Sequence, residues 1–105
     1  MEDFKIIYRI LRVLYMAMEC EIFDEQSLSP EALKTSLEKR DALLRMLVKN
    51  GYVEGITLAP VLGQKPLVKL SDHPQITLPG LEYLEENSLM QKAANAMKGL
   101  ADVVL

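Results

Sequence analysis

The order of local signals along the chain predicts a mainly α-helical domain with one small β-hairpin, an α+β fold. A helical pattern over residues 35–50 ends at Gly51 and is followed at once by the strand-forming residues Tyr52 and Val53. A second strand pattern at residues 75–78 leads directly into another helix. With 105 residues, the chain has room for a single hydrophobic core.

The N-terminal part of the chain predicts a long helix over residues 2–20. Its polar positions form one narrow stripe of Lys5, Arg9, Arg12 and Glu19, and almost every other position is apolar. A surface helix normally has an apolar stripe only a little over 100° wide. We therefore expect this helix to be buried on two sides, by the core and by either the C-terminal segment or a partner chain. We also expect its Cys20 to be packed.

Two helices joined by a very short turn are predicted next. Ser29 is a good cap and Pro30 suits a first helical position, which starts a helix of little more than one turn. Thr35 and Glu38 have the spacing of a capping box and predict the start of the longer helix. Helices joined this closely must cross at a steep angle, as in a helix-turn-helix.

The longer helix has an apolar face and a defined end. Residues with helical spacing predict its buried side, namely Leu37, Leu43, Leu44, Leu47 and Val48. Asn50 and Gly51 end the helix, because glycine readily adopts the left-handed conformation of a C-terminal cap. A strand is predicted from Val53 to about Leu58.

The segment after this strand is predicted to be an irregular, elongated wing. Pro60, Pro66 and Pro74 cannot donate to a β-ladder, so a long regular sheet is not expected. The chain should return as a strand over residues 75–78. The apolar side chains of residues 67–70 should lie on the body or on a partner.

The C-terminal part predicts two helices separated by a break. Pro79 begins the first, and Ser88 with Gln91 forms a second capping box after Asn87. The predicted organisation is a winged helix-turn-helix domain over residues 1–87. A C-terminal helix over residues 88–105 then packs on the same domain or across a dimer.

Two motifs carry a family resemblance, "NGYVEGI" at residues 50–56 and "ITLPGLEYLEENS" at residues 76–88. Together with the hydrophobic first helix and "LSPEAL", they resemble the YjcQ-like winged-helix proteins, which are small bacterial proteins often carried in prophage regions. The resemblance implies a winged-helix fold and a link to DNA. It brings no catalytic residues and no ligand.

The charge distribution favours a DNA contact at the helix-turn-helix and the wing. The whole chain has a formal net charge of −3, but residues 31–70 carry seven Lys or Arg against four acids. We expect the exposed side of the longer helix to face a major groove and the wing to hold the backbone. The candidate DNA-binding residues are Ser36, Lys39, Arg45 and Lys49 on the helix, and Lys65 and Lys69 in the wing. Arg45 is the candidate for reading guanine.

The competing interpretation is a non-catalytic protein-interaction module on the same scaffold, with no DNA contact. Solvated helix faces commonly carry lysines at this spacing, and the acidic flanks and apolar residues 67–70 also fit this alternative. In either case we expect a homodimer through the first and last helices.

Other classes of function have little support in the sequence. The single histidine and single cysteine, His73 and Cys20, cannot form a four-ligand zinc site, and no nucleophile elbow or phosphate-binding glycine loop is present. We therefore expect no catalysis, metal or cofactor. The apolar run over residues 4–18 is interrupted by basic residues and is too short to cross a membrane, and the lone cysteine fits a reducing cytoplasm.

Overall fold

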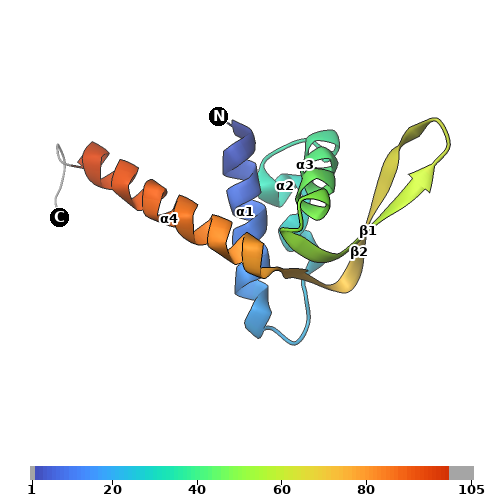
Figure 1. Cartoon of the computed structure of the whole chain (residues 1–105), viewed down its shortest axis with the longest axis horizontal. Helices are drawn as coiled ribbons and strands as arrows, with labels where there is room; N and C mark the ends of the chain where they lie inside the picture. Colours follow the sequence, from blue (N-terminus) through green and yellow to red (C-terminus); the bar gives the residue numbers. More distant parts are fainter. Residues whose placement is uncertain (1, 100–105) are drawn as a thin grey trace.

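The structure is a computed structural model that describes residues 2–99, and the side chains of residues 2–88. Its helices are α1 (Glu2–Met16), α2 (Pro30–Leu33), α3 (Leu37–Lys49) and α4 (Leu78–Gly99), with two short 3-10 turns, η1 (Ala17–Glu19) and η2 (Glu25–Leu28). The strands β1 (Val53–Val61) and β2 (Gln64–Ile76) form one antiparallel hairpin between α3 and α4 (Figure 1). The predicted α+β fold class is confirmed.

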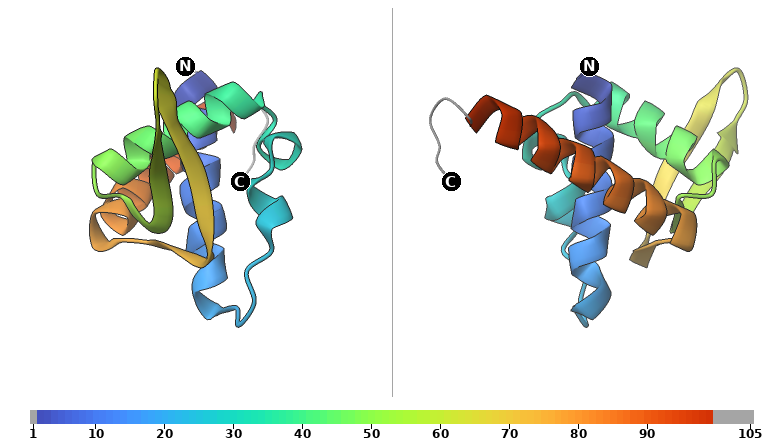
Figure 2. Two further views of the ribbon diagram at one scale, coloured as in Figure 1. Left: turned by 90° about the vertical axis from the view of Figure 1, so that its right-hand side faces the viewer. Right: turned by 60° about the vertical axis from the view of Figure 1, so that its left-hand side comes forward.

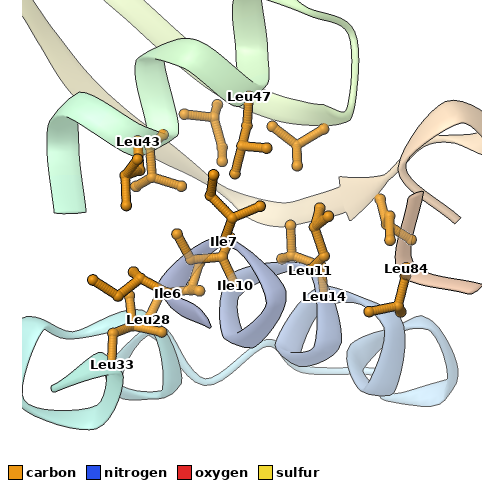
Figure 3. Close-up of a cluster of buried hydrophobic side chains, with 14 of the residues drawn as sticks. Ile6, Ile7, Ile10, Leu11, Leu14, Leu28, Leu33, Leu43, Leu47 and Leu84 are labelled. Carbon is orange, nitrogen blue, oxygen red and sulfur yellow. The ribbon is translucent and has the colours of Figure 1, made fainter. Parts of the chain in front are cut away.

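Helix α1 lies at the centre of the core, with α3 and the hairpin on one side and α4 on another (Figures 2 and 3). The fully buried side chains come from α1, η2, α2 and α3, and are Ile10, Leu11, Leu14, Leu28, Leu33 and Leu44. Leu84 of α4 is also buried against this cluster (Figure 3). Helix α1 is thus covered from two sides within one chain. It is shorter than predicted, however, and Phe4 and Met16 are 55% and 60% exposed.

The turn between α2 and α3 differs from the predicted one. Ser29 caps α2 as expected, but Ser36, rather than Thr35, caps α3 by accepting from the Lys39 amide at 3.1 Å. Lys34 adopts a left-handed conformation with φ of 59°, and the Thr35 amide donates to Pro30 O at 3.0 Å. Because Thr35 still closes the end of α2, Ser36 is the first residue free to cap α3.

Helix α3 buries a narrower face than predicted. Leu43, Leu44 and Leu47 are buried, whereas Leu37 is 51% exposed because it lies in the first turn, beyond the core. The predicted end at Asn50 and Gly51 is confirmed. The Gly51 amide donates to Val48 O and the Tyr52 amide to Leu47 O, which is the hydrogen-bond pattern of a Schellman cap.

The hairpin is much longer and more regular than predicted, so the expectation of an irregular wing was wrong. Strand β2 has 13 residues, and the register pairs Ile56 with Leu70 and Leu58 with Val68. In a two-stranded ribbon each strand has one free edge, where a proline does not remove a ladder bond. The register shifts also fall where the prolines lie. The first shift is between Ala59 and Val61, at Pro60. The second is between Glu54 and Ile56, and the segment of β2 opposite this shift contains Pro74.

A compact joint connects the end of α3, the base of the hairpin and the start of α4. Thr77 Oγ1 donates to Gly51 O at 2.6 Å and accepts from the Gly80 amide at 3.2 Å, so Thr77 caps α4. A Cβ on Gly80 would overlap Tyr52 O and approach Ile76. These contacts give a structural reason for the "ITLPG" motif, because a hydroxyl at residue 77 can make both hydrogen bonds and the close approach needs glycine.

Helix α4 is continuous through Asn87 and Ser88, so the predicted break there was wrong. The Asn87 side-chain amide donates to Tyr83 O at 2.8 Å, one turn back, and therefore stays with the helix instead of starting a new one. The proposed boundary between residues 87 and 88 falls within this helix, and residues 100–105 lie outside the described part. Beyond the turns that meet α1, α4 runs away from the rest of the molecule (Figures 1 and 2).

Candidate nucleic-acid interface

The outer face of α3 and the adjacent hairpin form the candidate interface. Helix α4 lies on the other side of α1, so it does not cover this face (Figures 1 and 2). Glu38, Lys39, Met46 and Lys49 of α3 are exposed. Ala42 lies between them on the helical projection and is partly buried. The predicted reading face is therefore open to solvent and lies next to a hairpin.

The side chain of Arg45, the candidate for reading guanine, contacts the hairpin in this structure. Its side chain is partly buried, and Nη1 donates to Pro66 O in β2 at 3.0 Å. This bond joins the middle of α3 to the hairpin near its tip. Arg45 therefore lies on the edge of the reading face that is next to the hairpin, and it holds the outer part of the hairpin.

Lys39 lies on the opposite edge of the face, against the start of α1. Its Nζ is 3.1 Å from Asp3 Oδ1, and the two side chains are 45% and 39% exposed. A salt bridge this exposed contributes at most about 1 kcal/mol, because water and salt screen it. An incoming phosphate can therefore compete with Asp3 for Lys39. Nothing in the sequence pattern alone indicated this pairing of residues from two helices.

Ser36 and Lys49 lie at the two ends of α3. The Ser36 hydroxyl oxygen accepts from the Lys39 amide as the helix cap, which leaves its proton free to be donated elsewhere. Lys49 is exposed in the last turn, where it complements the negative end of the helix dipole. Within residues 2–88, Lys49 takes part in no ion pair.

The two wing lysines lie on one face of the hairpin. Val68 and Leu70 are partly buried and pack on the core, so the alternating residues Lys65 and Lys69 are on the opposite face, and both are exposed. Thr57 is the cross-strand partner of Lys69. The six candidate residues thus form one group on α3 and one group on the hairpin. The hydrogen bond from Arg45 to Pro66 links α3 to the hairpin.

Other features of the predicted site differ from expectation or were missed. Cys20 is exposed rather than packed, because α1 has already ended before it. Met46, at 53% exposure, is an apolar residue on the reading face, next to Lys39 on the helical projection. Its spacing from Lys39 and Lys49 could have indicated this position. For Asp3, the only feature visible in the sequence was its place in the first turn of a helix, which does not indicate its contact with Lys39.

The one titratable group with a shifted pKa among the described residues, Tyr83, lies in α4, away from this face. Burial raises the pKa of the Tyr83 phenol, and the neighbouring Tyr52 adds to the effect. Their ring centroids are 5.5 Å apart. Among the described residues, no three histidine, cysteine or acidic side chains are close enough together to hold a metal ion. None of the described helices combines the length and the apolar character needed to cross a membrane.

Together these features define a small, mainly helical α+β protein in which a two-stranded hairpin directly follows its third helix. The chain belongs to the YjcQ family: the family model, described as "YjcQ protein", matches residues 8–103. Searches of curated proteins and of solved structures give no significant match.

Proposed function

We propose that this YjcQ-family protein is a small winged-helix regulator that binds double-stranded DNA with sequence selectivity. Helix α3 would enter the major groove and the hairpin would follow the backbone. The observation that carries the proposal is the open face of α3 beside a hairpin that Arg45 holds in place.

The side chains of this face suit distinct parts of a DNA site. Lys39, Lys49 and the Ser36 hydroxyl, at the edges and ends of α3, would contact phosphates, as would Lys65 and Lys69 from the hairpin. Such contacts set position and affinity. Ala42 and Met46 would offer apolar contact to thymine methyl groups, and Glu38 could accept from cytosine.

A DNA titration with two matched variants tests the proposal. Lys49→Gln removes a charge from the proposed interface, whereas Lys5→Gln removes the same charge from an exposed position on α1 that lies opposite the core-facing residues. Fluorescence anisotropy with random-sequence duplex DNA should show weaker binding for Lys49→Gln and a log–log salt slope smaller by about 1. Lys5→Gln should behave like the wild type. Equal affinity for both variants would contradict the assignment.

Under this proposal the protein is non-catalytic and acts in the bacterial cytoplasm. It forms a homodimer through α1 and α4. Two-fold symmetry would place two α3 helices on half-sites one helical turn apart, or a multiple of it. Two linked half-sites would also compensate for the small number of phosphate contacts that one protomer offers.

A second candidate function is a protein-interaction module without DNA contact. The observation that favours it is the apolar character of the hairpin, where Leu62 at the tip and Leu67 are 101% and 54% exposed. The same titration separates the two candidates. No binding to any duplex at low salt would rule out the DNA proposal and leave the interaction module.

A further inference from the structure

The end of α1 and the loop that follows it form an exposed apolar surface far from α3 (Figure 1). Tyr15, Met16, Met18 and Ile22 are 44%, 60%, 58% and 85% exposed. A groove of about 290 Å³ lies between α1 and this loop. Its apolar lining consists of Val13, Met16, Ala17, Ile22 and Phe23. We call this surface the α1-end groove.

The segment that follows α1 and forms one wall of the groove is acidic. Glu19, Glu21, Asp24 and Glu25 are all exposed on it, and Asp24 also lines the groove, where the one cation is Arg12. The Asp24 carboxylate is partly engaged, because it accepts from the Gln26 amide at 3.0 Å. The groove therefore suits an apolar segment that also carries positive charge.

The distal part of α4 has this composition. Residues 89–99 contain Leu89, Met90, Ala93, Ala94 and Met97. The same stretch contains Lys92 and Lys98 and no Asp or Glu. The helix continues through this stretch past the point where it meets α1 (Figure 2).

A chain cannot place this segment in its own α1-end groove. From its contact with α1, helix α4 runs towards the N-terminal side of the molecule, away from the end of α1 (Figures 1 and 2). A second copy is free of this constraint. It carries both the groove and the segment, so two copies can bind each other reciprocally, and the interface closes with two-fold symmetry.

We propose that residues 89–99 of α4 from one copy bind the α1-end groove of a second copy, and the reverse, to form a homodimer. Apolar burial at Met16 and Ile22 provides most of the attraction. The lysines of α4 meet the acidic segment that follows α1 and set the orientation. The inference specifies the surface of the dimer that the proposed function assumes, but it does not depend on DNA binding.

Sedimentation velocity of the full-length protein over a range of concentrations tests this interface. Ile22→Ser and the double variant Lys92→Glu/Lys98→Glu should each raise the dimer dissociation constant by about tenfold or more. Leu62→Ser is the matched control, because Leu62 is equally apolar and fully exposed at the hairpin tip. This control should leave the dissociation constant unchanged. Circular dichroism should show that all variants stay folded, since Ile22 contributes little to the core.

Cys20 gives an independent measurement, because it lines the groove and is the only cysteine in the chain. Its rate of reaction with a thiol reagent should fall as dimer forms, and should stay constant in the Lys92→Glu/Lys98→Glu variant. A wild-type monomer at high concentration would overturn the proposal. A dimer that Ile22→Ser and the double lysine variant leave intact would also overturn it. A monomer would remove the two-half-site arrangement from the proposed function. Neither result would contradict contact between α3 and DNA, which the Lys49→Gln titration tests separately.

Discussion

At the scale of single residues, Lys34 is the most informative position in the helix-turn-helix. Among the described residues it is the one non-glycine residue with positive φ, at 59°. Its amide donates to Glu31 O and thereby closes α2. A left-handed conformation costs an L-residue about 1–2 kcal/mol, and glycine avoids that cost. The turn therefore holds strain at a residue whose side chain is exposed.

Replacing Lys34 by glycine should stabilise the protein. We expect Lys34→Gly to raise the free energy of unfolding by about 0.5–1 kcal/mol, because relief of strain exceeds the added entropy of the unfolded chain. Urea denaturation followed by circular dichroism measures this change. Ala42→Gly, within α3, is the control and should lower the free energy of unfolding by about 1 kcal/mol. Destabilisation by both variants would contradict the assigned strain.

The same residue explains why the cap of α3 was predicted one position too early. The capping box of Thr35 and Glu38 is a local pattern, whereas the true cap depends on the left-handed Lys34 that keeps Thr35 in the end of α2. A lysine gives no sequence signal for this conformation. Gly51 does give such a signal, and the end of α3 was predicted correctly.

At the scale of elements, the base and the outer part of the hairpin are held differently. The base is anchored by Val53, Ile56 and Ile76 in the core, whereas the outer part is held to the body by one polar contact and a small apolar contact. Arg45 Nη1 donates to Pro66 O at 3.0 Å, while Val68 and Leu70 pack on the edge of the core. A partly buried charged hydrogen bond is stronger than a neutral one. The hairpin tip beyond Pro66 has an exposed Leu62 and no buried residue, so this bond is what anchors it.

Loss of the Arg45 guanidinium should loosen the hairpin without changing sequence preference. In Arg45→Gln, amide hydrogen exchange over residues 58–68 should accelerate several-fold, and affinity should fall alike for all DNA sequences, because a positioning contact is lost rather than a base contact. Lys69→Gln, the control, should weaken DNA binding while leaving amide exchange unchanged. Relaxed discrimination at one base pair would instead identify Arg45 as a base-reading residue.

The length of the hairpin could not be predicted from proline content alone. Pro60, Pro66 and Pro74 argued against a long sheet, yet a two-stranded ribbon accommodates them at its free edges and at two register shifts. Periodicity nevertheless predicted the order of elements, because burial on α1 and α3 follows helical spacing. Contacts between distant segments, such as Arg45 with Pro66 and Lys39 with Asp3, have no such local pattern.

At the scale of the whole molecule, the charges of the candidate interface are partly balanced by the protein itself. The net charge is −3, although residues 31–70 carry an excess of bases. Of these bases, Arg40 pairs with Asp41 at 2.8 Å and Lys39 with Asp3 at 3.1 Å. Fewer cations are then free for phosphate contacts than the sequence count indicates. Asp3 belongs to α1, so the first helix of the core modulates the charge of the reading face.

This arrangement predicts opposite effects for the two partners of the exposed salt bridge. Lys39→Gln should weaken DNA binding, because it removes a phosphate contact. Asp3→Asn should strengthen binding by about two- to threefold at low salt, because it frees Lys39 and removes a carboxylate beside the phosphates. Anisotropy titrations at two salt concentrations measure both effects, and the gain from Asp3→Asn should shrink at high salt.

The control for Asp3→Asn must separate release of Lys39 from the change in net charge. Glu2→Gln serves this purpose, because Glu2 is also an exposed acid in the first turn of α1 and changes the net charge equally. If Asp3 acts through Lys39, Asp3→Asn should strengthen binding more than Glu2→Gln does. Asp3→Asn should then have little further effect in a protein that already carries Lys39→Gln. Equal gains from the two acid variants would show that Asp3 acts only through net charge, whereas a direct phosphate contact of Lys39 is tested by Lys39→Gln itself.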